Sequence, residues 1–242
     1  MALLKVNNLH YTYPDGTQAL RGLSFSLDQG DRLAVVGANG CGKSTMLAHL
    51  SGCLVPPPGT LYLHDQEITE KNLKDLRRAA GLIFQDPDDQ LFMPTVLEDV
   101  GFGLIARQVP REEADRLSLE ALKKLSAESL ANRPPHRLSG GEKRAVALAG
   151  ILVMEPELLL LDEPSTALDP RARRRVINLL SQLKRPFILT THDLDMALDL
   201  CNRVAVLSAG QVVAMGGPEI LQDGPALERW GLELPLSLSS SR

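Results

Sequence analysis

Short aliphatic runs alternate with longer amphipathic segments along most of the chain. Three of these runs contain almost no polar residue: 81–84, 158–161 and 187–190. Strands of this composition are buried on both faces, which is typical of a parallel sheet covered by helices. Further runs bounded by turn residues predict strands at 3–9, 23–27, 32–36 and 60–63.

The amphipathic segments between these runs predict helices at 43–51, 140–154 and 169–184. Residues 86–137 have a different pattern, with no convincing strand and a charged helical stretch at 111–131. The sequence therefore predicts an α/β core that carries a helical insert. We place the core at 1–85 and 138–217, the insert at 86–137 and a short C-terminal extension at 218–242.

The composition predicts a soluble intracellular protein. The chain has 242 residues and a formal net charge of −4, without the basic excess expected of a general nucleic-acid or anionic-membrane binder. The longest uncharged apolar stretch, 145–154, is about half as long as a membrane-spanning helix. The five histidines and three cysteines show no ligand cluster, so we do not expect the chain itself to hold a metal cargo.

The strongest chemical signal follows the predicted strand 32–36 directly. The segment reads Gly37-Ala38-Asn39-Gly40-Cys41-Gly42-Lys43-Ser44-Thr45 and matches GxxxxGK[ST] between a strand and a helix. Glycines let successive main-chain N–H groups point inward at a helix N-terminus, which creates an anion site. The lysine supplies a charge to the β- and γ-phosphates, and the serine hydroxyl can ligate Mg²⁺. This pattern predicts a nucleotide-binding loop.

A second element is the run of four leucines at 158–161 that ends in Asp162 and Glu163. An aspartate at the end of a strand beside a phosphate loop can hold the hydration shell of Mg²⁺. Glu163 is placed one residue further on, where a carboxylate can polarise the attacking water as a general base. A strand ending in Asp-Glu-Pro is a weak pattern alone, but with the phosphate loop it predicts nucleotide hydrolysis.

Other short motifs occur in a fixed order around these two: Gln85, Leu138-Ser139-Gly140-Gly141-Glu142, Ser165-Thr166-Ala167-Leu168-Asp169 and Thr191-His192-Asp193. Together they resemble an ATP-binding-cassette (ABC) ATPase from about residue 3 to residue 217. The resemblance implies a P-loop NTPase core with an N-terminal antiparallel β subdomain, an inserted helical subdomain, and hydrolysis of ATP with Mg²⁺. It also implies a head-to-tail dimer, and because every motif is intact we expect a homodimer.

The resemblance assigns roles around the phosphates. Gln85 would contact Mg²⁺ and the attacking water, together with the metal ligands Ser44 and Asp162. His192 would bind the γ-phosphate and hold the water in line with Glu163. The residues that would face the ATP of the second subunit are Ser139, Gly140, Gly141 and, in the loop crossing the interface, Asp169.

Some positions leave alternatives open or depart from the family pattern. Tyr13 matches the aromatic position that stacks on adenine, while Tyr11 is a second candidate and a structural tyrosine a third possibility. Glu142 stands where glutamine is more usual, and Thr166 where serine or alanine is. Both changes conserve size, so activity is still expected. We interpret Cys41 as a small neutral filler of the loop rather than a redox group.

The insert carries a narrower resemblance. The segment 84–92, Phe-Gln-Asp-Pro-Asp-Asp-Gln-Leu-Phe, is similar to the segment after the glutamine loop in energy-coupling-factor importers, where Gln90 would belong to a short nucleotide-responsive helix. A solvated acidic helix start is the simpler explanation of residues 86–89. Stretches similar to the cobalt/nickel branch of these importers occur at 13–16, 132–141 and 224–235.

The leading hypothesis is therefore the peripheral ATPase subunit of a cobalt or nickel importer, on the cytoplasmic side of the membrane. Its partners would be a second copy of itself and integral membrane subunits. One alternative is the same cassette in a vitamin importer, and another is a non-transport ABC ATPase acting on nucleic acid or ribosomes. The basic cluster 171–175 is better explained by a solvated helix face, so no nucleic-acid partner is expected.

Overall fold

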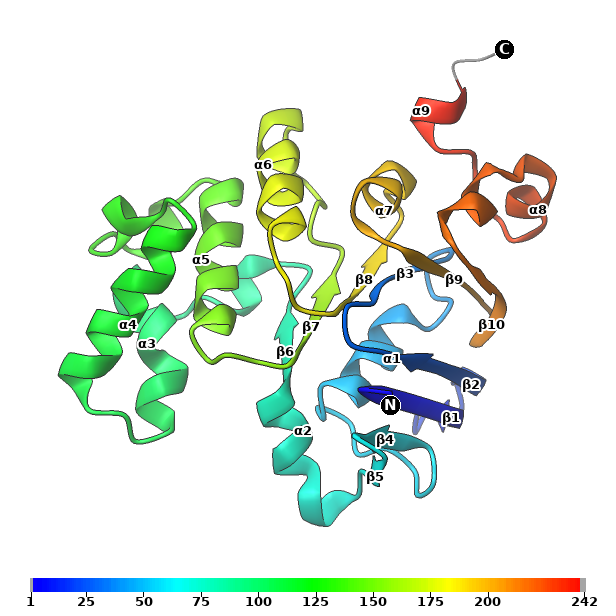
Figure 1. The fold of residues 1–242 in the computed structure, drawn as a ribbon, viewed down its shortest axis with the longest axis horizontal. Helices are drawn as coiled ribbons and strands as arrows, with labels where there is room; N and C mark the ends of the chain where they lie inside the picture. The colour runs from blue at the N-terminus through cyan, green and yellow to red at the C-terminus, as the bar shows by residue number, and fades with distance from the viewer. Residues whose placement is uncertain (1, 240–242) are drawn as a thin grey trace.

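The computed structural model describes residues 2–239 and is built around a six-stranded sheet of order β10-β9-β3-β8-β7-β6 (Figure 1). All neighbouring strands are parallel except β10, which pairs with β9 in the antiparallel sense. The strands are Arg32–Val36 (β3), Ala80–Ile83 (β6), Leu158–Asp162 (β7), Phe187–Thr191 (β8), Arg203–Ser208 (β9) and Gln211–Gly216 (β10).

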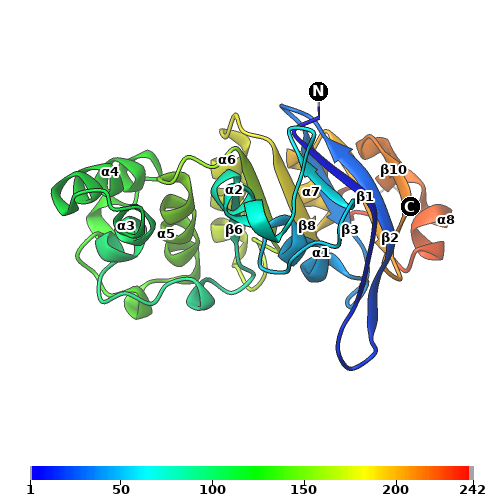
Figure 2. The same cartoon turned by 90° about the horizontal axis from the view of Figure 1, so that it is seen from below.

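A smaller antiparallel sheet of order β2-β1-β4-β5 packs beside the main sheet. Its strands are Leu4–Thr12 (β1), Gln18–Leu27 (β2), Leu61–Leu63 (β4) and Gln66–Glu67 (β5). The hairpin of β1 and β2 is longer than the sequence predicts and projects from the body of the molecule (Figure 2). The main-chain N–H of Arg21 donates to the carbonyl of Gly210 at 2.8 Å, which ties this sheet to the main one.

Helices cover both faces of the main sheet. Helices α1 (Lys43–Leu50) and α2 (Leu73–Ala79) lie on the side of the antiparallel sheet, and α5 (Gly140–Leu152), α6 (Pro170–Ser181) and α7 (Leu194–Leu200) lie on the other. Strand β7 shows why its sequence is uniformly aliphatic. Leu158 and Leu160 belong to the core on the first side, whereas Leu159 and Leu161 belong to the core on the second.

The segment 86–137 forms a helical lobe at one end of the molecule (Figure 1). Its helices α3 (Val96–Ala106) and α4 (Arg111–Lys124) pack against α5, and short 3₁₀ turns occupy Pro87–Asp89, Glu128–Leu130 and Pro135–Arg137. The helix predicted to reach residue 131 ends at Lys124, because Ser126 adopts a positive φ of 55° that stops the α-helix.

The C-terminal extension packs against the core. It forms a 3₁₀ turn at Pro218–Gln222 and the helices α8 (Gly224–Arg229) and α9 (Leu236–Ser239). Leu221 and Leu227 are fully buried in the core cluster that includes α7. The main-chain N–H of Ser237 donates to a carboxylate oxygen of Asp195 on α7, and residues 240–242 lie outside the described part. No helix between residues 2 and 239 is long and apolar enough to cross a bilayer.

We expect the centre of β7 to carry much of the stability. Leu160→Ala should lower the free energy of unfolding by about 2–5 kcal/mol, because a fully buried side chain is replaced by a void. Leu119→Ala, on the partly exposed surface of α4, should change it by less than about 0.5 kcal/mol. Urea unfolding followed by circular dichroism measures both; equal losses would contradict the assignment of the core.

Candidate functional site

A cavity of about 320 Å³ opens at the carboxyl edge of the main sheet. Strands β3, β7 and β8 end beside it, which is where open parallel sheets bind ligands. Its lining brings together the phosphate loop, the Asp-Glu pair and His192, which the sequence predicts from separate motifs. The lining residues are Tyr13, Thr17, Gln18, Ala19, Asn39, Gly40, Gly42, Lys43, Ser44, Thr45, Gln85, Asp162, Glu163 and His192.

Two glycines of the phosphate loop are required by its geometry. A side chain at Gly37 would place its Cβ 2.1 Å from the carbonyl oxygen of Leu207. Gly42 has a φ of +111°, and a Cβ there would lie 2.7 Å from the carbonyl oxygen of Ala19. The loop can therefore adopt this path into α1 only because Gly37 and Gly42 have no side chains.

Gly37 and Cys41 do not line the cavity, although the sequence predicts that the whole loop binds phosphate. The Cys41 side chain is buried in the core beneath the loop, and burial raises the pKa of its thiol. This placement agrees with a small filler. A direct ligand contact by the Gly37 main chain or by the Cys41 side chain stays a prediction, because neither residue lines the cavity.

Lys43, the first residue of α1, is buried and already has hydrogen-bond partners. Its Nζ donates to the carbonyl oxygens of Gly37 at 2.7 Å and Ala38 at 3.2 Å. It also lies 3.9 Å from Oε1 of Glu163. The ammonium group is thus held across the mouth of the loop, where an anion bound to the main-chain N–H groups would meet it.

Glu163 is the most constrained charged group in the cavity. It follows β7 with a φ of +44°, and only 4% of its surface is exposed. The main-chain N–H of His192 donates to its Oε2 at 3.1 Å. Its Oε1 lies 3.0 Å from Nε2 of His192 but has no hydrogen-bond partner. Burial raises the pKa of Glu163, against the opposing effects of His192 and Lys43.

Asp162 and Gln85 lie on the neighbouring strand ends. Oδ1 of Asp162 accepts a hydrogen bond of 2.6 Å from the hydroxyl of Thr190, its partner on β8. Gln85 follows β6 by two residues, and both side chains line the cavity. The carboxylate, the Gln85 amide and the Ser44 hydroxyl together provide oxygen donors of the kind that Mg²⁺ prefers.

Tyr11 in β1 and Tyr13, which directly follows the last residue of β1, have different surroundings. The Tyr13 ring is partly exposed and lines the cavity, and its hydroxyl lies 2.9 Å from the hydroxyl of Thr45. Tyr11 packs edge-on between Tyr13 and His49 and does not line the cavity. The geometry therefore favours Tyr13 over Tyr11 as a stacking surface for a flat ligand.

The segment 138–142 lies away from this cavity. Ser139 caps the N-terminus of α5 in a reciprocal capping box: the Ser139 N–H donates to Glu142, and the Glu142 N–H donates to the Ser139 hydroxyl. Ser139 and Gly140 are exposed, and neither lines the cavity. Asp169 is also exposed and caps α6 by accepting from the N–H groups of Arg171 and Ala172.

A family model described as ABC transporter matches residues 20–166, more than half of the chain. The chain belongs to the ABC transporter ATPase family. An energy-coupling factor transporter ATP-binding protein, EcfA, of Methanothermobacter thermautotrophicus is 42% identical over 96% of this chain and 77% of its own length. This cassette is therefore an ATP-hydrolysing subunit of a transporter, similar to EcfA.

Solved structures share the fold of the cassette. CbiO1 of Clostridium perfringens, part of the ABC transporter complex CbiONQ, has a TM-score of 0.83 at 37% identity over 94% of both chains. The cassette MJ0796, in a dimeric structure bound to ADP and phosphate, has a TM-score of 0.78 at 29% identity. The structural match covers 89% of this chain and 98% of the MJ0796 chain. The predicted family, fold class and ATPase activity are thus confirmed.

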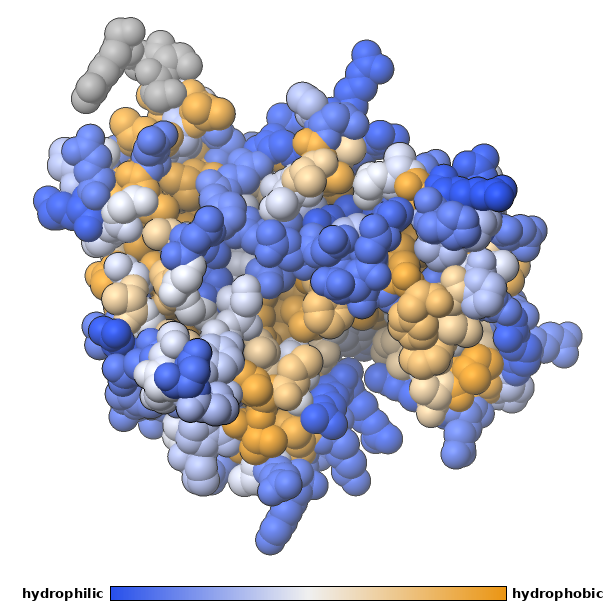
Figure 3. Space-filling model, turned by 180° about the vertical axis from the view of Figure 1, so that it is seen from behind, coloured by the Kyte–Doolittle hydropathy of each residue, from blue (hydrophilic) through white to orange (hydrophobic). Residues whose placement is uncertain are grey.

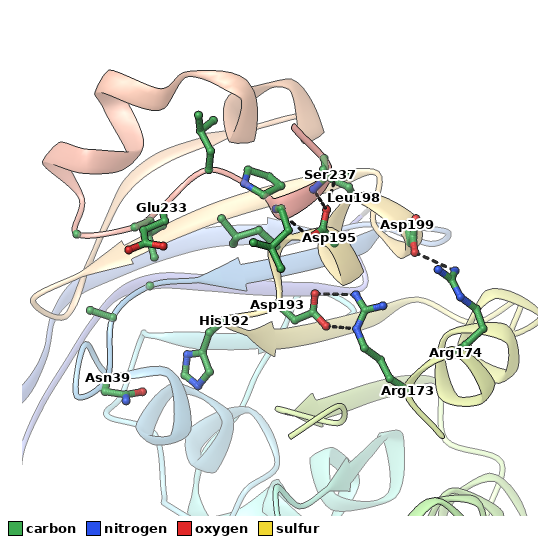
Figure 4. A pocket seen from close by; sticks show the side chains of 18 residues that line it. Asn39, Arg173, Arg174, His192, Asp193, Asp195, Leu198, Asp199, Glu233 and Ser237 are labelled. Carbon is green, nitrogen blue, oxygen red and sulfur yellow. Dashed lines mark hydrogen bonds and ion pairs between the residues drawn. The ribbon is translucent and has the colours of Figure 1, made fainter. Parts of the chain in front are cut away.

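A larger groove of about 1000 Å³ lies next to the phosphate loop, between α6, α7 and the C-terminal segment (Figure 4). Arg173 donates to Asp193 and Arg174 to Asp199, so two arginines of the basic cluster are paired within the cassette. The main-chain N–H of Ser237 donates to Asp195 on the opposite wall. The sequence did not indicate this groove, because its walls come from segments far apart in the chain.

Glu163 should make the stability of the cassette depend on pH. Its raised pKa means that the ionised side chain costs stability, and this cost develops as the pH rises above the pKa of the unfolded chain. Glu163→Gln should therefore gain stability relative to the wild type as the pH rises above 4.5, the ordinary pKa of a glutamate side chain. Urea unfolding at a series of increasing pH values measures the difference, with exposed Glu112→Gln as the control. A difference that does not change with pH would contradict the assignment.

Proposed function

We propose that this cassette powers an energy-coupling-factor importer of a transition-metal ion, cobalt or nickel. The choice of a metal is carried by the stretches 13–16, 132–141 and 224–235, which are similar to the cobalt/nickel branch. The likeness to EcfA proteins and to CbiO1 supports the transporter type. The cassette would act from the cytoplasmic side on integral membrane subunits, and the metal cargo would be bound by those partners.

The lining of the 320 Å³ cavity fits ATP with Mg²⁺. The loop that begins after β3 provides main-chain N–H groups and Lys43 for the phosphates, and Tyr13 offers its ring to adenine. Ser44, Gln85 and Asp162 provide oxygen ligands for Mg²⁺, which neutralises charge on the β- and γ-phosphates when bound. Lys43 would exchange its contacts with the carbonyls of Gly37 and Ala38 for phosphate oxygens.

Glu163 is the proposed general base. Its Oε1 is buried without a hydrogen-bond partner, so a water bound between it and the γ-phosphate would satisfy it. The water oxygen attacks the γ-phosphorus, the bond to the ADP oxygen breaks, and the water proton passes to Glu163. His192, which contacts both oxygens of Glu163 through its ring and main chain, holds the carboxylate and the phosphate in position.

A second copy of the chain is needed to complete each site. The exposed N-terminus of α5 carries Ser139, Gly140 and Gly141, but these residues do not reach the cavity of their own chain. Such a helix end can bind a phosphate of another molecule. We propose that it faces the γ-phosphate held by a partner cassette, with Asp169 in the loop between the two. The dimeric MJ0796 structure supports this arrangement.

The helical insert offers the surface for the membrane subunits. Phe92 is 63% exposed and packs edge-on against the exposed ring of Phe102, with Phe84 and Ile105 also exposed on the insert side. Figure 3 shows apolar side chains gathered on this lobe. Gln90 lies at its base and donates to the carbonyl of Ala147 on α5, at 3.0 Å. An apolar surface of this kind is typical of a docking site.

The alternative of a nucleic-acid partner has less support. Within the basic cluster, Arg173 and Arg174 form ion pairs with Asp193 and Asp199 of α7 and its N-terminal cap. They are therefore not free to neutralise a phosphate backbone. A vitamin importer would use the same cassette, and only the membrane partners and their cargo distinguish it from the metal importer.

Glu163→Gln should bind ATP, hydrolyse it at least about 100-fold more slowly and accumulate as a closed dimer, because the general base is lost while the phosphate contacts stay. Lys43→Ala should lose ATP binding.

Mixing Lys43→Ala with Ser139→Ala should restore at most one working site per dimer. Sedimentation and ATPase assays measure these outcomes. Full activity of Ser139→Ala alone would overturn the shared site.

The cargo is tested with the complex purified from membranes through a tag on this subunit. Reconstituted into vesicles with ATP, it should accumulate cobalt or nickel, and the Glu163→Gln complex should not. Vitamins added at the same concentration should not compete. Uptake of a vitamin instead of either metal would replace the proposed cargo while keeping the transporter type. Salt-sensitive binding of RNA or DNA by the pure cassette would favour the non-transport alternative.

A further inference from the structure

Arg144 of α5 is a buried charge that the proposed hydrolysis does not use. Its side chain is 5% exposed, and burial lowers its pKa despite the attraction of Asp86 and Asp162. Among residues 2–239 it forms no ion pair, and its Nε has no hydrogen-bond partner. A guanidinium buried without a carboxylate is costly, and an apolar side chain of similar volume would stabilise the core better. This cost points to a role other than packing.

The partners of Arg144 lie in the segment that leads from β6 into the insert. Nη1 donates to the main-chain carbonyl of Phe84 at 2.6 Å, and Nη2 donates to that of Gln85. The guanidinium therefore clamps the backbone at Gln85, whose side chain lines the ATP cavity. Two carbonyls at one planar group fix direction as well as distance, which an ammonium group cannot do.

Further contacts join the same two elements. Lys143 forms an ion pair of 2.6 Å with Asp88, and Gln90 bridges from the Phe84 N–H to the carbonyl of Ala147. Arg144 differs from Lys143 and Gln90 because its side chain is buried and because it donates a hydrogen bond directly to the Gln85 carbonyl. It is also five residues from Ser139, so it lies about one and a half turns into the helix that presents the exposed phosphate-binding end.

We propose that Arg144 is a positioning residue that couples the two ATP sites in which each chain takes part. The first site contains Gln85 of its own chain, and the second uses Ser139 at the start of α5. When the Gln85 backbone moves on nucleotide binding, Arg144 carries the displacement to α5. The N-terminus of α5, with Ser139, is then aligned for the partner's ATP only when the ATP site of its own chain is filled. This inference rests on the proposed head-to-tail dimer.

Hydrogen exchange with mass spectrometry tests the coupling on the full chain, at concentrations where sedimentation shows monomer. The probe is Mg²⁺ with a non-hydrolysable ATP analogue. In the wild type we expect nucleotide to slow exchange in peptides from both 84–90 and 139–147, by about fivefold or more. In Arg144→Lys the response at 37–45 should persist, whereas that at 139–147 should fall below about twofold.

Arg107→Lys is the matched control, because Arg107 is exposed and donates to the carbonyl of Met154, 3.2 Å away. It should retain the wild-type response. If Arg144 had only a structural role, its substitution would raise the exchange rate at 139–147 equally with and without nucleotide. The ratio of the rate without nucleotide to the rate with nucleotide would then be the same in Arg144→Lys as in the wild type, and this result would overturn the inference. A wild type that binds nucleotide without a response at 139–147 overturns it as well.

Arg144→Gln keeps an amide NH2 as a hydrogen-bond donor group but lacks the charge. It repeats the test if the lysine variant loses the cooperative thermal unfolding transition of the wild type. Failure of the proposed dimer is a separate result. It would appear as a Glu163→Gln protein that stays monomeric with ATP, whatever the exchange data show.

Discussion

The site depends on how the Glu163 carboxylate and the Lys43 ammonium group are held near each other in a mostly buried space. Glu163 and Lys43 are both nearly inaccessible, yet their charged atoms stay 3.9 Å apart rather than forming a close pair. The carbonyls of Gly37 and Ala38 occupy the ammonium, and His192 contacts the carboxylate. Each charge therefore keeps the capacity to engage a ligand. In the proposed reaction, a triphosphate and its attacking water would supply the missing partners, since buried charges gain most from groups that complete their coordination.

The separation between Glu163 and Lys43 depends on the parallel register of the main sheet. Asp162 lies opposite Thr190, and Val36 lies opposite Thr191, so the three chain ends that follow β3, β7 and β8 leave the sheet at one level. The aliphatic strands below them are buried on both faces and fix this level rigidly. A shift of one residue in any strand would reverse the faces of its side chains and separate Glu163 from Lys43. The same strand register is thus required both for burial of the core side chains and for the geometry of the site.

The sequence predicts those parts of the site that are contiguous in the chain. The phosphate loop and the Asp162-Glu163 pair are recognisable in the sequence because their residue types follow directly on their strands, and the predicted family and fold class are confirmed. The Arg144 clamp and the packing of Tyr11 on His49 were not found, since each depends on residues brought together only by folding. The end of α4 was misplaced because nothing in a helical periodicity reveals the positive φ of Ser126. The domain boundaries and individual site roles stay predictions.

The capping box at Ser139 shows what formation of the proposed dimer must change. In the single chain the carboxylate of Glu142 accepts hydrogen bonds from the main-chain N–H and the hydroxyl of Ser139, both at 2.7 Å, which lowers the pKa of Glu142. A γ-phosphate docking on this helix end would compete for the same donors and meet a negative charge. The glutamine more usual at this position would cap without that charge. Arg133 and Arg175 also attract the Glu142 carboxylate and help to lower its pKa. In the proposed dimer, closure on ATP would exchange one anion for another at the end of α5, and the difference between the two would contribute to the free energy of dimer formation.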